Sequence, residues 1–130
     1  MISQTDIDAL RPADPWTNIP GIANHPAHKE EGQKYDQAKP PMALLDPAFL
    51  EEVANVLGFG ANKYAAHNWR NGIQYSRLIS AAYRHLGAIN RGEDIDPESG
   101  LPHAGHLGCC VMFLSSMMKT RPDMDDRWKG

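Results

Sequence analysis

The sequence has few cysteines, no long apolar run and no excess of basic residues, and each absence excludes a class of protein. The two cysteines, Cys109 and Cys110, are adjacent, which predicts reduced thiols in an intracellular protein rather than a disulfide framework. No apolar stretch approaches the roughly 20 residues that a membrane-spanning helix needs. Thirteen Lys and Arg against 16 Asp and Glu give a net charge of −3, which argues against nucleic-acid or membrane-surface binding.

The chain also begins without the basic and apolar segments of a secretory signal, so we expect a cytoplasmic protein. Its 130 residues are enough for one folded domain. Seven of the ten prolines lie in the first 47 residues, where apolar residues show no helical period. We therefore expect an irregular N-terminal arm over residues 1–33, a helical domain over 34–119 and a loosely held polar tail over 120–130.

Strand-like alternation is absent, and three segments have the period of amphipathic helices. The first begins at Asp46-Pro47, the second covers residues 75–91, and the third runs from residue 102 to about 119. The residues predicted to face inward are Leu50, Val53, Ala54, Leu57, Ala61 and Tyr64 on the first; Leu78, Ala82, Leu86 and Ile89 on the second; and Leu107, Cys110, Val111, Leu114 and Met118 on the third. The fold class is therefore all-α. Because three helices make a thin core, we expect a small bundle completed by homo-oligomerisation.

Acidic residues are missing between Leu57 and Gly92, while basic residues recur there at seven-residue intervals: Lys63, Arg70, Arg77, Arg84 and Arg91. The following loop is acidic and contains Glu93, Asp94, Asp96 and Glu98. Carboxylates hold divalent cations and basic side chains neutralise phosphate oxygens, so this pattern indicates a metal–phosphate site. Arg77, Arg84 and Arg91 also fit a solvated helix face, whereas Lys63 and Arg70 lie near a turn and are better phosphate candidates.

Three histidines lie at or beside the apolar faces of the predicted helices. His103 and His106 are three residues apart on the third helix, and His85 is at the edge of the second. Imidazole together with carboxylate suits Mn, Co, Fe, Ni, Zn and Mg. The histidines and the acidic loop are thus a candidate metal site, with structural polar contacts as the alternative.

Glu52 falls on a stripe of the first helix with Phe49, Val56 and Lys63. A carboxylate beside apolar residues needs an ion pair or a metal, so a Glu52–Lys63 salt bridge and metal coordination are both open. Trp69, with Tyr64 and Asn68 nearby in sequence, could stack on a nucleobase or could instead fill a core or an interface.

Several short motifs occur in one order and together resemble a known family. They are Lys34-Tyr35-Asp36, Leu44-Leu45-Asp46-Pro47, Gly60-Ala61-Asn62-Lys63-Tyr64, Asn68-Trp69, Arg84-His85, and Gly92-Glu93-Asp94-Ile95-Asp96-Pro97-Glu98-Ser99-Gly100 followed by His103 and His106. Over about residues 32–118 this combination resembles the phage-associated dATP/dGTP diphosphohydrolase N-terminal domain. The resemblance implies metal-dependent hydrolysis of purine deoxynucleoside triphosphates to monophosphate and pyrophosphate, in control of a phage nucleotide pool in the host cytoplasm.

The chain is more distantly similar to the all-α nucleotide pyrophosphohydrolases of the MazG type. Those proteins pair an EExxE helix with an ExxD motif. Here Glu51-Glu52-Val53-Ala54-Asn55 ends in asparagine, and Glu93-Asp94-Ile95-Asp96 supplies the ExxD spacing.

On this interpretation the metal, which would be Mg, Mn or Co, is held by Glu52, Glu93, Asp96, His103 and His106. His85 and Glu52 are the candidate catalytic residues. The triphosphate is clamped by Lys34, Lys63 and Arg70, Trp69 faces the base, and Tyr64, Asn68 and Arg84 complete the substrate-binding set. Two other functions stay open: a non-catalytic nucleotide-binding sponge, and an HD-type triphosphohydrolase, although the sequence has no His-Asp doublet.

Overall fold

A computed structural model of the chain describes residues 2, 3, 5 and 32–130 and divides into two units, Met1–Leu45 and Asp46–Gly130. In the first unit, the described residues from 32 onward are exposed and include the short 3-10 helix η2 (Met42–Leu44). The expected irregular arm over residues 1–33 lies outside the described residues, apart from positions 2, 3, 5, 32 and 33.

Helix α3 (Pro47–Lys63) opens the second unit and begins where the sequence predicts. Asp46 has an extended backbone, and its side chain accepts a hydrogen bond of 3.1 Å from the Ala48 N–H. Pro47 occupies the first helical position, where its missing N–H costs nothing. A capping aspartate and the proline together fix the start of the helix.

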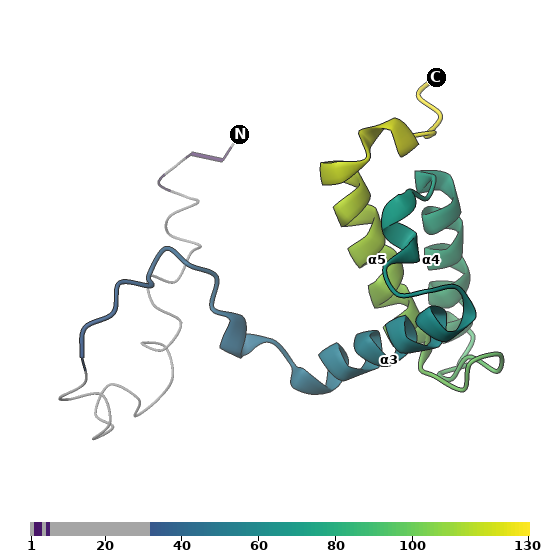
Figure 1. Cartoon of the computed structure of the whole chain (residues 1–130), viewed down its shortest axis with the longest axis horizontal. Helices are drawn as coiled ribbons and strands as arrows, with labels where there is room; N and C mark the ends of the chain where they lie inside the picture. The colour runs from purple at the N-terminus through teal and green to yellow at the C-terminus, as the bar shows by residue number, and fades with distance from the viewer. Residues whose placement is uncertain (1, 4, 6–31) are drawn as a thin grey trace. The chain divides into compact units, whose positions relative to one another are not determined.

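Helices α4 (Tyr75–Asn90) and α5 (His103–Thr120) form an antiparallel pair in the second unit (Figure 1). Their core is built from Tyr75 and Leu78 of α4 and Met117 of α5, which is fully buried. Both helices match the predicted segments to within one residue at each end. At the other end of the pair, His85 of α4 meets the first turn of α5.

Helix α3 crosses the first half of α5, where two glycines allow a close approach. A Cβ built on Gly105 would lie 3.0 Å from the backbone oxygen of Glu52, and one on Gly108 would lie 2.8 Å from the Phe49 ring. The stripe that carries Phe49, Glu52 and Val56 therefore faces α5. The predicted inward face of α3 is wrong at Leu50, Ala54 and Tyr64, which are exposed, because the side chains of the neighbouring stripe fill the space above the glycines.

Part of the predicted inward face of α4 and α5 also lies at the surface. Leu86, Val111 and Met118 are 51%, 57% and 48% exposed. The prediction that they are core residues of the single chain is wrong, because α3 covers another side of α5. These side chains stay available to a second molecule, and homo-oligomerisation stays a prediction.

The residues after α5 are held against α4, so the expectation of a loose tail is wrong. After the short helix η4 (Pro122–Met124), Asp126 accepts hydrogen bonds from the Ser76 N–H, at 2.8 Å, and from the Ser76 hydroxyl. Arg121 donates to the backbone oxygen of Asn71. Asp126 thereby caps the N-terminus of α4, which has no side-chain cap from its own flanking residue.

Helices account for the regular structure of the described residues, in which the sole β-type pairing is an isolated bridge between Ile95 and Pro102. The predicted all-α class is confirmed. Within the same residues, every helix is too short or too polar to cross a bilayer.

Candidate functional site

The acidic loop between α4 and α5 folds back onto the first turn of α5. The bridge between Ile95 and Pro102 closes the loop, and the Asp96 N–H donates to the Leu101 oxygen at 2.8 Å. Gly92, with a φ of 90°, turns the chain out of α4 in a conformation that favours glycine. The loop thereby brings Glu93 and Asp96 to the histidines of α5.

Glu93, His103 and His85 form one chain of contacts across three elements. The Glu93 Oε1 atom lies 2.7 Å from His103 Nε2, and His103 Nδ1 lies 2.8 Å from His85 Nδ1. His103 is 4% exposed, whereas the Glu93 side chain is half exposed. A buried imidazole is thus connected to a carboxylate on one side and to a second imidazole on the other.

Asp96, Ser99 and His106 form a second chain of contacts beside the first. The Ser99 hydroxyl oxygen lies 2.7 Å from Asp96 Oδ2 and 2.7 Å from His106 Nε2, and it accepts the Leu101 N–H at 3.2 Å. The His106 ring stacks on the His85 ring, with centroids 4.7 Å apart and an interplanar angle of 9°. His85 therefore touches both chains and joins them into one cluster.

Hydrogen-bond polarity assigns the tautomers of two rings. Carboxylates only accept, so the Ser99 proton goes to Asp96, and His106 Nε2 donates to the Ser99 oxygen. By the same reasoning His103 Nε2 donates to Glu93. The Nδ1 atoms of His103 and His106 then carry lone pairs in the neutral rings.

Burial and neighbouring charges favour neutral imidazoles in this cluster. Burial lowers the pKa of His85, and the adjacent His106 and His103 rings lower it further. Burial also lowers the pKa of His106, against the attraction of Asp96. Partial burial opposes the ionisation of Asp96, but hydrogen bonds from Ser99 outweigh it and lower the pKa of that carboxyl. These shifts favour neutral rings at His85 and His106 and an ionised carboxylate at Asp96.

The side chains of this cluster are of the types that bind transition metals, but in the described arrangement they do not form a complete coordination site. Neutral imidazoles held by carboxylates at their other nitrogen are the usual environment of metal-ligating histidines. The Nδ1 atoms of His85 and His103 are 2.8 Å apart, which is a hydrogen-bond distance; two nitrogens bound to one tetrahedral metal at about 2.1 Å would lie roughly 3.4 Å apart. In the part of the chain that the structure describes, no three His, Cys, Asp or Glu side chains form a group that could hold a metal ion.

Glu52 and Lys63 do not form the salt bridge that was one alternative. Lys63 Nζ instead lies 3.4 Å from Glu98 Oε1 of the acidic loop, and this contact raises the lysine pKa. Glu52 lies beside the α5 turn that carries Gly105, between His103 and His106. Across residues 32–130, its carboxylate takes no part in an ion pair.

Within the second unit, the predicted substrate residues Trp69 and Arg70 make their contacts away from the histidine cluster. Trp69, in the 3-10 helix η3 (Asn68–Asn71), stacks on Phe113 at 4.5 Å, and the Arg70 guanidinium lies 4.3 Å from the Trp69 ring centroid. Phe113 is seven residues beyond His106, or about 10 Å along α5. The stacking contacts of Trp69 are therefore made within the chain, at the Met117 end of the helix pair.

Three further residues of the predicted substrate-binding set are exposed, each on a different element. Tyr64 is 68% exposed at the end of α3, with Lys63 Nζ 5.5 Å from its ring centroid. Lys34 is exposed in the first unit, and Arg84 is exposed on α4. The structure thus brings together His85, Glu93, Asp96, His103 and His106, and it places Glu52 and Lys63 beside elements of that cluster. Trp69 and Arg70 make their contacts elsewhere in the second unit.

Ser99 is a member of the cluster that sequence reasoning missed. Its hydroxyl joins Asp96 to His106, and its N–H also donates to Asp96 at 3.1 Å. An aspartate followed three residues later by serine is a local signal for a side chain that closes a turn. That spacing could have identified the hydrogen bonds between Asp96 and Ser99, but not the contact with His106.

Comparisons with known proteins agree with the motifs. The family model described as dATP/dGTP diphosphohydrolase, N-terminal, matches residues 29–127. A curated protein of Salmonella phage PMBT28, named dATP/dGTP diphosphohydrolase, is 44% identical over 96 residues, which are 74% of this chain and 33% of the relative. The chain thus spans about a third of that relative's length.

No solved structure matches the chain. The more distant similarity to MazG-type enzymes stays a prediction. The family match covers most of the chain, including every element of the histidine cluster. The chain therefore belongs to the dATP/dGTP diphosphohydrolase, N-terminal, family.

Proposed function

We propose that this chain carries the site of a metal-dependent hydrolase that converts dATP and dGTP to monophosphate and pyrophosphate. The observation that carries the proposal is the cluster of His85, His103 and His106 with Glu93 and Asp96. The name of the phage relative supports the substrate, and membership of the family supports the reaction class. In a phage, such an enzyme would control the purine deoxynucleotide pool.

The predicted ligands of the metal are Glu52, Glu93, Asp96, His103 and His106. A divalent ion bound there would supply Lewis acidity toward the phosphate oxygens and would lower the pKa of a bound water. Glu93 and the Asp96–Ser99 pair hold the outer nitrogens of His103 and His106, so the Nδ1 lone pairs point away from the carboxylates. In the described arrangement the two carboxylates position the rings, and their direct coordination of the metal is the predicted part of the ligand set.

His85 is the candidate proton-transfer residue. Its low pKa keeps the ring neutral, and a neutral imidazole can take a proton from the attacking water. In the reaction, the water oxygen bonds to the α-phosphorus, the bond from that phosphorus to the bridging oxygen breaks, and pyrophosphate leaves. Lys63 lies beside the acidic loop, where its ammonium can neutralise phosphate charge.

The test is to incubate the full chain with each dNTP and NTP plus Mg, Mn or Co and to resolve the products by phosphorus NMR. The proposal expects monophosphate and pyrophosphate from dATP and dGTP. Release of intact triphosphate would assign the HD-type reaction, and unchanged nucleotide that co-elutes with the protein would assign a binding protein. Either result would overturn the proposed reaction.

Variants of the cluster connect the activity to the site. His103→Ala should abolish metal-dependent turnover, and circular dichroism should show a folded protein. Because His103 is buried, Glu93→Gln provides a second variant on a half-exposed side chain. The matched control is Glu51→Gln, which removes an exposed carboxylate on α3. Equal turnover in Glu93→Gln and Glu51→Gln would count against a role for the cluster.

We also infer that the functional form is a homo-oligomer. A groove of about 220 Å³ between α4 and α5 is lined by Leu78, Ile79, Ala82, Tyr83, Leu86, Leu107, Cys110, Val111 and Leu114. This lining has no charged side chain, and several of its members are more than half exposed. A second copy of the chain presents the same apolar face, so symmetric pairing would bury both faces and thicken the core.

A further inference from the structure

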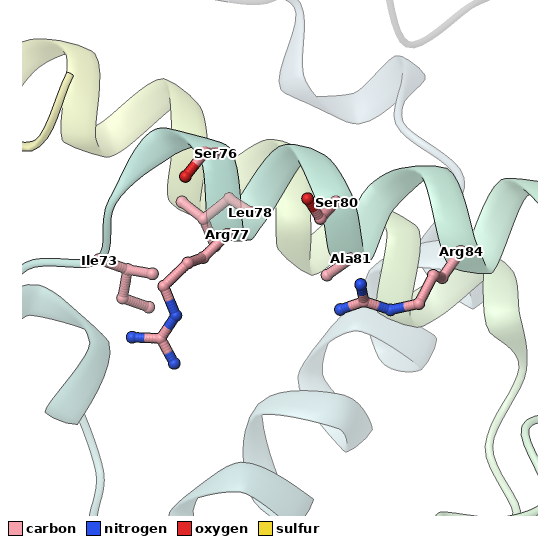
Figure 2. A pocket seen from close by; sticks show the side chains of 7 residues that line it. All are labelled: Ile73, Ser76, Arg77, Leu78, Ser80, Ala81 and Arg84. Carbon is pink, nitrogen blue, oxygen red and sulfur yellow. The ribbon is translucent and has the colours of Figure 1, made fainter. Parts of the chain in front are cut away.

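A second pocket lies on α4, on the side that carries arginines (Figure 2). It has a volume of about 370 Å³ and is lined by Ile73, Ser76, Arg77, Leu78, Ser80, Ala81 and Arg84. Figure 2 shows the guanidinium groups of Arg77 and Arg84 on the same side of the helix, with the small side chain of Ala81 between them. None of the residues in the histidine cluster lines this pocket.

The two arginines of this pocket have no carboxylate partner among the described residues. In contrast, Arg121 pairs with Asp123 at 2.7 Å and Arg127 with Asp125 at 2.9 Å. The pocket also falls in the acid-free segment from Leu57 to Gly92. One lining residue contacts a carboxylate: Ser76, eight residues before Arg84, hydrogen-bonds Asp126 at 2.8 Å. The pocket is therefore positive at its Arg84 end.

We propose that this pocket binds a polyphosphate anion. Guanidinium groups bind phosphate oxygens in pairs, with more geometric specificity than ammonium groups. Arg77 and Arg84 are seven residues apart, about 10 Å along the helix axis. Their side chains are long enough to contact opposite ends of one di- or triphosphate. Ser80 also lines the pocket, and Figure 2 shows its hydroxyl directed away from the two guanidinium groups.

This inference rests on the proposed function for its ligand, because phosphoanhydrides are both the substrate and the product of that reaction. Arg84 immediately precedes His85 of the histidine cluster, so the two residues lie on the same turn of α4. The polyphosphate could come from the tail of the nucleotide or from the released pyrophosphate. On this inference Arg77 binds the anion and is not merely part of a solvated helix face.

The test measures binding to the full chain by isothermal titration calorimetry, with EDTA present so that metal-assisted binding is absent. One arm titrates inorganic pyrophosphate, and the other titrates the non-hydrolysable α,β-methylene analogue of dATP. The variants are Arg77→Gln and Arg84→Gln, both on exposed side chains. Arg91→Gln is the matched control, because it removes the same charge from the end of the same helix without lining the pocket.

The proposal expects pyrophosphate affinity to fall about tenfold or more in each pocket variant, as for the loss of a charge-assisted hydrogen bond, and much less in Arg91→Gln. A parallel loss for the dATP analogue assigns the pocket to the nucleotide tail, and a loss confined to pyrophosphate assigns it to the product. Absence of pyrophosphate binding by the unaltered protein, or an equal loss in Arg91→Gln, overturns the proposal. Hydrolysis with metal is measured separately, so failure of the proposed reaction leaves this result interpretable.

Discussion

The close approach of α3 to α5 at Gly105 makes a quantitative prediction. In Gly105→Ala, the new methyl group would lie 3.0 Å from the Glu52 oxygen and 3.2 Å from the Glu52 carbonyl carbon. These are backbone atoms, so they cannot rotate away, and the two helices must separate by a few tenths of an ångström. Overpacking of this kind costs about 1–3 kcal/mol. Alanine returns up to about 1 kcal/mol of helix propensity.

The expected net effect is a loss of about 1 kcal/mol in the free energy of unfolding, or a fall of roughly 4–8 °C in Tm. The control is Gly58→Ala on α3, where nothing lies within 4 Å of the added methyl, so only the propensity gain applies. Thermal unfolding followed by circular dichroism measures both. If Gly105→Ala is as stable as Gly58→Ala, the contact between α3 and α5 is not as close as described here, and the placement of Glu52 beside the histidines loses its support.

Three further outcomes follow from other contacts. Asp126→Ala should lower stability near neutral pH, because hydrogen bonds from Ser76 lower the pKa of Asp126. In the parent protein this stabilisation is present above the ordinary aspartate pKa of about 3.9 and is lost as pH falls through the lower pKa of the folded state. Unfolding midpoints measured over a pH series should therefore fall less steeply at acidic pH in the variant than in the parent protein. Ser99→Ala should reduce metal affinity or turnover by about 10–100-fold and Ser99→Thr by less; nitrogen NMR should show an altered His106 tautomer, and an unchanged spectrum would contradict the assignment. Val111→Glu should yield a smaller species by light scattering than Ser115→Glu on the same helix, and equal masses would remove the groove from the oligomer interface.

Much of the fold could be predicted because the signals are local. The capping pair Asp46-Pro47 predicts where α3 begins, and the apolar periodicity of α4 and α5 predicts both ends of each helix to within one residue. The packing face of α3 could not be predicted from its own sequence. It depends on Gly105 and Gly108, about 55 residues later, which make close approach possible on one side of α5. Periodicity alone does not distinguish Leu50, which is half exposed, from Val53, which contacts α5.

The candidate site shows the same division. The sequence shows the spacing of His103 and His106 and the acidic loop that precedes them. The structure brings the two together through the turn at Gly92. The hydrogen bond from Ser99 to His106 depends on how the loop folds onto α5, which no local pattern encodes. Trp69 is the opposite case. An aromatic residue in a polar turn suggests a site for nucleobase stacking, but the Trp69 ring stacks on Phe113 and contacts the Arg70 guanidinium within the chain.

The cap of α4 by Asp126 has a consequence for the order of events during synthesis. The first turn of α4 is translated 50 residues before the carboxylate that completes it. A nascent chain that has exposed α4 and α5 still has an unfinished helix start and an uncovered edge of the core beside Tyr75. We therefore expect the second unit to reach its full stability only after residue 126 leaves the ribosome.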